Sequence, residues 1–266
     1  MNALNENLVI VIPARKNSKR LKNKNFKKFF GFPLFEWSLA AGLFLKQQLS
    51  GSREVSVVCT SDDKQILDLV KKKYSSTVLA VRRKPELSDD NAILSDVIFD
   101  CVYKLAERHV IHLDDYLSGS FILLQPTSPI RLKDDLVSFC RQIKNLGNNL
   151  SMVSVNKNYS AVKDIYEIIN FSEVKSHFLL GHIGKKLLEV QDIKKHRYSA
   201  FVDGSLYLGL MSMLKEKGFM PAAKTLAFPL SIKRSIDIDS EEEFKDALVL
   251  IKELQNLEIE YVSPKI

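Results

Sequence analysis

The chain has 266 residues, of which 45% are hydrophobic and 27% are charged, and its formal net charge is +7. This balance is typical of a globular protein and excludes a disordered or fibrous one. The longest apolar runs near the amino terminus, Leu8–Ile12 and Phe29–Phe35, are too short to span a bilayer. Positive charge follows the first run instead of preceding it, so we expect neither a signal peptide nor a membrane partner.

The cysteines bear on the cellular compartment. Cys59, Cys101 and Cys140 are widely spaced, and each lies in an apolar segment. Their number and spacing fit neither a disulfide framework nor a zinc site. Because a free cysteine behaves as a small hydrophobic residue, we expect buried thiols in a reducing compartment, which predicts a cytoplasmic protein.

Strand and helix patterns alternate along the first half of the chain. Apolar or β-branched runs predict strands at 8–12, 55–59, 77–81 and 121–124, and helical spacing predicts helices at 32–49, 64–73 and 93–108. This alternation predicts a parallel sheet with helices on both faces, as in nucleotide-binding α/β folds. Ligands in such folds bind at the carboxyl ends of the strands, so the informative loops follow Ile12, Thr60, Val81 and Leu124.

The pattern changes after Asn148. Strands are predicted at 150–155, 205–210 and 228–238, and Ser240 with the acidic residues after it predicts a final helix that ends near Leu257. Residues 156–200 mix short apolar stretches with basic clusters and lack strong periodicity. We interpret them as an inserted β-rich arm, and we divide the rest into an α/β core made of 1–155 and 201–266.

Much of the positive charge lies in one loop after the first predicted strand. The loop contains no acidic residue. Its basic residues are Arg15, Lys16, Lys19, Arg20, Lys22, Lys24, Lys27 and Lys28. Cations and exposed amide groups at the end of a buried strand can neutralise a triphosphate, which carries about four negative charges. The P-loop pattern is absent. Taken alone, the charge run also fits a solvated loop or an RNA-contacting patch.

Two further segments carry candidate binding groups. The segment Gln125–Arg131 presents an amide and two hydroxyl groups beside a cation, on a turn that contains two prolines. In Arg83–Ala92 an arginine precedes a loop rich in serine and aspartate, a composition that suits base edges and ribose. Taken alone, each segment also fits a structural turn or a capping loop.

An acidic pair lies in the last predicted strand. Asp237 and Asp239 are two residues apart and would therefore face the same side of that strand. Paired carboxylates are unfavourable unless a cation or a proton lies between them, and Mg²⁺ with a phosphate is the usual solution. We predict Mg²⁺ as a cofactor at this pair, with capping of the following helix as the structural alternative.

These segments resemble the motifs of the acylneuraminate cytidylyltransferases, also called CMP-sialic acid synthetases. The basic loop carries the family's residues at the family's spacing: Ala14, Arg15, Asn17, Ser18, Lys19, Lys24 and Asn25. Similar segments follow in the family's order at Arg83–Ala92, Leu123–Arg131, Val202–Tyr207 and Arg234–Asp239. The resemblance extends from Leu8 to Leu250, which is nearly the whole chain.

The resemblance implies a Rossmann-like nucleotidyltransferase core with a parallel-rich sheet, and an arm at 156–200 that mediates a homodimer on the sugar side. It implies an enzyme that transfers CMP from CTP to the anomeric hydroxyl of a nonulosonic acid and releases pyrophosphate. The implied roles are catalytic for Arg15, Lys19 and Lys24; nucleotide-binding for Ala14, Arg15, Ser18, Lys24, Asn25, Arg83 and Ser88; sugar-binding for Gln125, Lys163, Asp203 and Tyr207; and metal-binding for Asp237 and Asp239.

The chain departs from the family pattern near the sugar. Asp203 stands where asparagine is usual, and Phe201 stands where some bacterial members have an arginine; Lys163, His196 or Arg197 could compensate. A cytidylyltransferase for Kdo or amino-Kdo is therefore the alternative enzyme. The alternative from another class is a non-catalytic, basic RNA-binding or regulatory protein on the same scaffold. On the enzyme hypothesis we expect no nucleic-acid partner.

Overall fold

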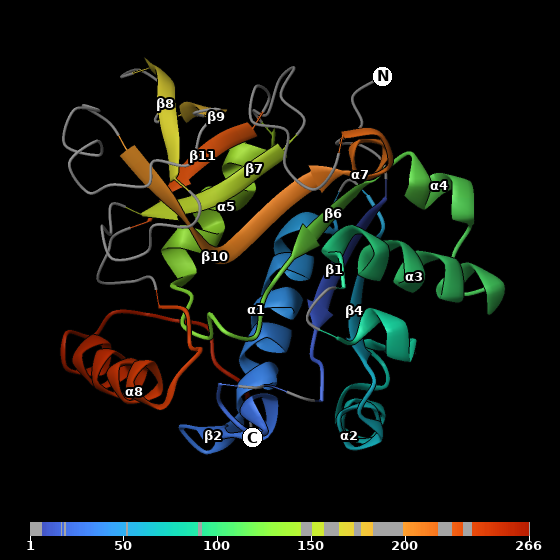
Figure 1. The fold of residues 1–266 in the computed structure, drawn as a ribbon, viewed down its shortest axis with the longest axis horizontal. Helices are drawn as coiled ribbons and strands as arrows, with labels where there is room; N and C mark the ends of the chain where they lie inside the picture. The colour runs from blue at the N-terminus through green and yellow to red at the C-terminus, as the bar shows by residue number, and fades with distance from the viewer. Residues whose placement is uncertain are drawn as a thin grey trace.

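The computed structural model describes residues 7–16, 18, 20–51, 53–89, 92–144, 151–156, 165–172, 177–182, 199–217, 225–230 and 236–265. Within this part of the chain, a nine-stranded sheet has the order β5-β4-β1-β6-β10-β7-β11-β9-β8 (Figure 1). Its strands are β1 (Leu8–Pro13), β4 (Val55–Ser61), β5 (Leu79–Arg82), β6 (Ser120–Leu123), β7 (Ser151–Asn156), β8 (Ile165–Ser172), β9 (His177–His182), β10 (Ser199–Leu210) and β11 (Thr225–Pro229).

A short hairpin and several helices complete the described structure. The hairpin pairs β2 (Lys28–Phe29) with β3 (Phe32–Pro33). The α-helices are α1 (Leu34–Leu49), α2 (Lys64–Tyr74), α3 (Leu94–Glu107), α4 (Leu113–Leu117), α5 (Lys133–Lys144), α7 (Met211–Lys217) and α8 (Glu241–Asn256). Short 3-10 turns occur at Lys24–Phe26 and Pro85–Leu87.

The strands β5, β4, β1 and β6 are neighbours and run parallel. β1 lies between β4 and β6, with Ile10 opposite Val57 and Ile122. Every residue from Leu8 to Ile12 is fully buried, as expected for a strand in a parallel sheet covered on both faces. β10 is antiparallel to β6 and β7, and β7 is parallel to β11. The predicted α/β class with a mostly parallel sheet is confirmed.

Helices cover both faces of the sheet. α1, α2 and α5 pack on the face to which Ile10 of β1 points, and α3, α4 and α7 pack on the opposite face, to which Val11 points. α1 approaches the sheet closely at Gly42, where a Cβ atom would lie 3.2 Å from Val57 Cγ1. α8 belongs to a third cluster, in which Phe244 meets the ring of Phe29 from the β2–β3 hairpin.

Three elements differ from the expectations. β11 ends at Pro229 and residues 236–239 form no strand, so the strand predicted at 228–238 is wrong. β10 begins at Ser199, six residues before the predicted start at 205, because its first residues pair with β8. We did not predict α5, although Leu136, Phe139, Cys140 and Ile143 show helical spacing and are all buried.

The segment 156–200 is described only in part. β8 and β9 pair with each other, β9 pairs with β11, and β8 pairs with β10. The described strands therefore extend the central sheet at the edge opposite β5. The domain division and the dimer remain predictions, and residues 157–164, 173–176 and 183–198 lie outside the described residues. Among the helices that the structure describes, none is long and apolar enough to cross a membrane.

The three cysteines are buried free thiols, as predicted. Burial raises the pKa of Cys59 in β4 and of Cys101 in α3 to about 12, and the positive charge of Arg83 opposes both shifts only in part. Because the thiolate is the reactive form of cysteine, these two groups are unreactive at neutral pH.

A buried arginine connects three elements near the carboxyl end of β6. Arg131 is 3% exposed, and its guanidinium donates to the carbonyl oxygens of Gln125 (3.0 Å) and Ser205 (2.9 Å) and to Ser38 Oγ (3.1 Å). Since these partners lie in the loop after β6, in β10 and in α1, Arg131 fixes the position of that loop relative to both elements.

Asp203 of β10 provides the counter-charge for this arginine. Asp203 is buried, and its Oδ1 accepts hydrogen bonds from Ser154 Oγ and from the amide of Ser205, the latter at 3.0 Å. Burial lowers the pKa of Arg131, and the Asp203 carboxylate opposes that shift. A buried charge is tolerated when an opposite charge and hydrogen bonds compensate it, so the two residues stabilise each other.

We expect thiol reagents to react slowly with the native protein. Near neutral pH, DTNB should modify none of the three cysteines rapidly, because they are buried and because Cys59 and Cys101 stay protonated. In denaturant all three should react. Rapid release of thionitrobenzoate from the folded protein would contradict the described burial.

The Arg131–Asp203 pair predicts a stability effect. Asp203→Asn keeps the size of the side chain but removes its charge, so the free energy of unfolding should fall by about 2 kcal/mol. Asp68→Asn is a matched control, since Asp68 pairs with Lys64 on an exposed helix surface, where such a pair contributes about 0.5 kcal/mol or less. Equal effects of the two substitutions in urea denaturation would show that the buried pair is unimportant.

Candidate active site

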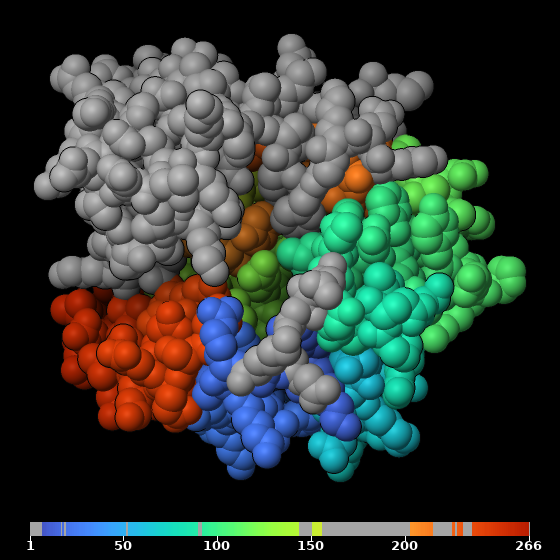
Figure 2. Space-filling view, in the orientation of Figure 1, coloured from blue at the N-terminus to red at the C-terminus, as the bar shows by residue number. Residues whose placement is uncertain are grey.

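The loops at the carboxyl ends of β1, β5 and β6 surround a cavity of about 280 Å³. Its described lining includes Pro13, Arg15, Ser18, Lys24 and Asn25 after β1, Arg83, Leu87, Asp89 and Ala92 after β5, Leu94 and Val97 of α3, Gln125, Pro126 and Thr127 after β6, and Asp239. Figure 2 shows the amino-terminal (blue) and carboxyl-terminal (red) segments side by side on this face of the molecule. Three of the four loops expected to be informative therefore contribute to one cavity.

Hydrogen bonds hold the basic loop against the sheet. Asn25 is buried, and its Nδ2 donates to the carbonyl oxygen of Arg15 at 2.7 Å, which ties the two ends of the loop together. The amide of Lys16 donates to Asp62 Oδ1 at 2.8 Å, and the amide of Ala14 donates to the carbonyl oxygen of Thr60 at 2.9 Å. The fourth loop, after β4, thus supports the site without lining the cavity.

The structure divides the basic residues of this loop into groups. Arg15 and Lys24 line the cavity, whereas Lys16, Lys22 and Lys28 are exposed. Lys27 forms an ion pair with Glu241 and lies 4.5 Å from the centre of the Phe244 ring. Asn17 and Lys19 lie outside the described residues, so the catalytic role expected for Lys19 stays a prediction. Two of the three residues expected to be catalytic, Arg15 and Lys24, therefore line the cavity.

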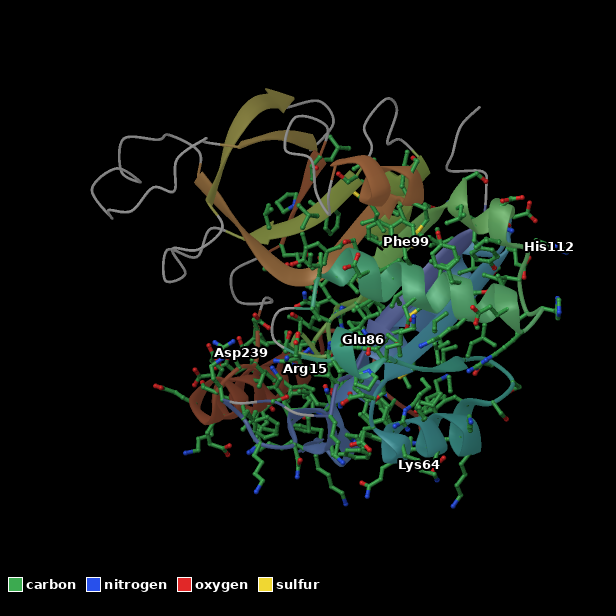
Figure 3. The ribbon with its side chains drawn as sticks, turned by 45° about the vertical axis from the view of Figure 1, so that its right-hand side comes forward. Arg15, Lys64, Glu86, Phe99, His112 and Asp239 are labelled. Atoms are coloured by element: carbon green, nitrogen blue, oxygen red, sulfur yellow. The ribbon has the colours of Figure 1, made fainter. Side chains whose placement is uncertain are left out.

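Asp239 faces this group of cations. Lys24 Nζ lies 2.8 Å from Asp239 Oδ1, and the Arg20 guanidinium pairs with Asp239 Oδ2. Figure 3 shows the labelled Arg15 and Asp239 close together, although they come from opposite ends of the chain. The Arg20 side chain is 72% exposed and does not line the cavity, and its pairing with Asp239 joins the outer part of the basic loop to the segment before α8.

A helix cap fixes the backbone of Asp239. Glu243 Oε2 accepts hydrogen bonds from the amides of Asp239 (2.8 Å) and Ser240 (2.7 Å), and Ser240 Oγ accepts from the amide of Glu243. This is the capping box expected at the start of α8. The carboxylate is therefore presented by a residue whose own position is set by a helix end.

Asp237 is exposed and Asp239 is half-buried and lines the cavity, although no strand forms here. Ile238 between them is fully buried, and its amide donates to the carbonyl oxygen of Thr127 at 2.7 Å. Asp237 keeps contact with solvent over much of its surface. Even so, burial of its carboxyl group raises its pKa, the charge of Asp239 adds to the rise, and a hydrogen bond with Thr127 opposes it. The two carboxylates are thus close enough to interact.

This pair fits a divalent cation that also binds phosphate. The described residues contain no group of three or more His, Cys, Asp and Glu side chains able to hold a metal ion. Mg²⁺ commonly uses one or two carboxylates together with substrate phosphates and water, so two carboxylates are a suitable donor set. A cation would also relieve the repulsion from Asp239, which adds to the effect of burial in raising the pKa of Asp237. Their role as Mg²⁺ ligands remains a prediction.

The loop after β5 forms the opposite wall. Arg83 is 5% exposed, lines the cavity, and donates from its guanidinium to the carbonyl oxygen of Thr60 at 2.9 Å. Burial lowers its pKa. Ser88, expected to bind the nucleotide, does not line the cavity, and its Oγ donates to the carbonyl oxygen of Lys84. Asp90 and Asn91 of this segment lie outside the described residues.

Sequence reasoning missed Leu94 and Val97 of the cavity lining. They lie beyond the predicted segment Arg83–Ala92, and with Leu87 and Ala92 they supply apolar lining. Leu94 and Val97 are three residues apart at the start of α3, a spacing that places them on one helix face, so a signal was present. Such a wall beside Arg83 suits the flat, partly apolar surface of a base.

The predicted sugar-binding residues are only partly brought together. Gln125 lines the cavity, and a Cβ atom on Gly204 would lie 3.4 Å from Gln125 Oε1 and 3.9 Å from the Tyr207 hydroxyl. Gln125 and Tyr207 therefore converge on Gly204, whose φ of +78° suits glycine. Asp203 does not line the cavity, because its carboxylate faces Ser154 and the Ser205 amide. Lys163 and the side chain of Phe201 are outside the described part.

Comparisons with known proteins agree with this arrangement. Residues 9–258 match the cytidylyltransferase family. CMP-N,N'-diacetyllegionaminic acid synthase from Legionella pneumophila is 34% identical over 55% of this chain and 57% of its own. N-acylneuraminate cytidylyltransferase from Streptococcus agalactiae is 24% identical over 89% of this chain and 51% of its own. The chain thus spans about half the length of these two relatives.

Another relative and a solved structure match over most of their length. Pseudaminic acid cytidylyltransferase from Campylobacter jejuni is 26% identical over 91% of this chain and 95% of its own. The structure of CMP:2-keto-3-deoxy-manno-octonic acid synthetase complexed with CTP is similar with a TM-score of 0.62 and 16% identity, covering 92% of this chain and 98% of that one. The structural likeness supports the fold. Because the family match covers residues 9–258, the chain belongs to the cytidylyltransferase family, as its motifs predict.

Proposed function

We propose that this chain is an enzyme that transfers CMP from CTP to the anomeric hydroxyl of a nonulosonic acid and releases pyrophosphate. The observation that carries the proposal is the convergence of Lys24, Arg83, Gln125 and Asp239 on one cavity. The substrate class is supported by the names of the relatives, which are synthases and cytidylyltransferases of legionaminic, neuraminic and pseudaminic acids.

In the proposed complex the nucleotide lies between the basic loop and the loop after β5. Arg15 and Lys24 neutralise the phosphates, since both line the cavity. They lie in the basic loop that follows the buried strand β1, where backbone amide groups can also bind an anion. Arg83 and the apolar residues at the start of α3 contact the base and ribose. Lys19 joins the phosphate ligands on the strength of the family resemblance.

The acceptor sugar lies at the other end of the cavity, beside Gln125 and Tyr207. Its anomeric hydroxyl oxygen forms a bond to the α-phosphorus, in line with the bridging oxygen to the β-phosphate. That bridging bond breaks, pyrophosphate leaves with the bonding electron pair, and the hydroxyl proton is lost to solvent or base. Lys24 and Arg15 stabilise the negative charge that develops on the phosphates, because fixed cations stabilise such charge best in a partly enclosed site.

Asp237 and Asp239 would hold Mg²⁺, which screens the charge of the phosphates and orients them. The amino-terminal cap of α8 positions one of these ligands, because Glu243 accepts a hydrogen bond from the Asp239 amide. The chain also contributes Thr127, whose carbonyl oxygen accepts from Ile238 and sets the separation between the acidic pair and the loop that carries Gln125.

The internal pairing of the loop supports an enzyme over a polyanion-binding protein. Of its cations, Arg20 and Lys24 pair with Asp239, and Lys27 pairs with Glu241. The carboxylates of Asp239 and Glu241 beside these cations would repel the successive phosphates of a nucleic acid, whereas the divalent cation of a CTP complex would offset the charge of Asp239. We also propose a homodimer formed through 156–200, by family resemblance, and a cytoplasmic location, which the buried free thiols suit.

The acidic pair gives the most direct activity prediction. Asp239→Ala should lower pyrophosphate release from CTP, Mg²⁺ and the acceptor sugar by about 100-fold or more, because the metal and the loop cations lose their shared ligand. Asp68→Ala, on the exposed surface of α2, is the control and should leave the rate unchanged. Circular dichroism should show that both variants are folded.

The substrate class is tested with a panel of neuraminic, legionaminic and pseudaminic acids and Kdo. We expect pyrophosphate release with at least one nine-carbon acid, and slower release with Kdo. If the wild-type protein with CTP and Mg²⁺ released none with any member of the panel, the proposed function would be wrong. Preference for Kdo would favour the eight-carbon alternative.

A further inference from the structure

Both carboxylate oxygens of Asp239 are occupied by cations of the basic loop. Lys24 Nζ contacts Oδ1 at 2.8 Å, and Arg20 contacts Oδ2. The Lys24 side chain is 12% exposed and that of Asp239 is 25% exposed, so their contact is partly withdrawn from water. Partial burial weakens solvent screening, and such a pair is held more firmly than a pair on an open surface.

The same atoms are needed by the substrate and the metal. Carboxylate and phosphate oxygens are both anionic acceptors of hydrogen bonds, so Asp239 occupies donor positions of Lys24 that a triphosphate would use. Conversely, an ammonium group on a carboxylate oxygen takes one of that oxygen's two lone-pair sites, and its positive charge repels Mg²⁺ and weakens its binding. The groups that are to bind the nucleotide and the cation therefore neutralise each other in the described structure.

We propose that Asp239 is an internal competitor of the nucleotide: it holds Lys24 and Arg20 in place of phosphate, and the triphosphate and a divalent cation displace these contacts together. This inference rests on the proposed function. Lys24 is the cation that the nucleotide would contact in the cavity, whereas the Arg20 side chain is 72% exposed and does not line it. The competition makes the nucleotide and the metal each strengthen the binding of the other, because the nucleotide draws away the cations that repel the metal and the metal neutralises the carboxylate that repels the nucleotide. Asp239 weakens nucleotide binding without metal and promotes it with metal.

A neighbouring ion pair provides a matched control. Lys27 and Glu241 form the same kind of contact close by, but neither residue lines the cavity. Neutralising Glu241 therefore changes the local net charge by the same amount as neutralising Asp239, without freeing a cation inside the cavity. Comparing the two neutralised variants therefore separates competition between Asp239 and the nucleotide from a general electrostatic effect.

The first experiment measures CTP binding by isothermal titration calorimetry in the presence of EDTA, which removes divalent cations. Asp239→Asn should bind metal-free CTP about tenfold more tightly than the wild type, because Lys24 and Arg20 lose a charged competitor. Glu241→Gln should change the affinity less than about twofold. An unchanged or weaker affinity of Asp239→Asn, or an equal gain in Glu241→Gln, would overturn the proposal.

The second experiment measures Mn²⁺ binding by electron paramagnetic resonance in the absence of nucleotide. Lys24→Met should bind Mn²⁺ about fivefold more tightly than the wild type, since Asp239 is partly freed. Lys27→Met should not, and thermal unfolding should show that all variants are folded. Unchanged or weaker Mn²⁺ binding by Lys24→Met overturns the inference, whether or not the protein uses CTP. Absence of CTP binding in the wild type with Mg²⁺ would instead refute the proposed function.

Discussion

The separation of charge across one cavity is the constraint on which the rest of the structure depends. Cations at the end of β1 and carboxylates before α8 face each other where solvent is partly excluded. Neither group would be stable there alone, because a partly buried charge requires an opposite charge or hydrogen bonds. In the ligand-free protein, the contact between Lys24 and Asp239 gives each of these charges an opposite partner. In the complex, the phosphates would be the partner of the cations and a divalent cation would be the partner of the carboxylates.

The fold brings these charges together through the parallel arrangement of β5, β4, β1 and β6. Because parallel strands end at the same edge of the sheet, their following loops meet there. Supporting contacts then fix each loop. Asn25 closes the basic loop, Arg131 holds the loop after β6, and Glu243 fixes Asp239. Of these three residues, Arg131 and Glu243 determine the geometry of the site without lining the cavity, whereas Asn25 also lines it.

Much of this could be predicted from the sequence, since the signals are local. The buried run Leu8–Ile12, the cap at Ser240 and the matched motifs predicted the fold class and most of the cavity lining. The failures concern contacts between distant segments. Whether Asp203 faces a sugar or Ser154, and whether the exposed Arg20 pairs with Asp239, depends on packing that no local pattern contains. The strand expected around Asp237 and Asp239 is absent, yet Ile238 between them is buried and the charge of Asp239 adds to the raised pKa of Asp237.

The central claim is that this cavity binds CTP by replacing the internal ion pairs of the basic loop. A crystal structure of the protein with CTP and Mg²⁺ tests it most directly. We predict phosphate oxygens on Lys24, the metal beside Asp239, and a distance from Lys24 Nζ to Asp239 beyond about 4 Å, the limit of an ion pair. CTP bound elsewhere, or bound in the cavity with the contact between Lys24 and Asp239 still intact, would contradict the account.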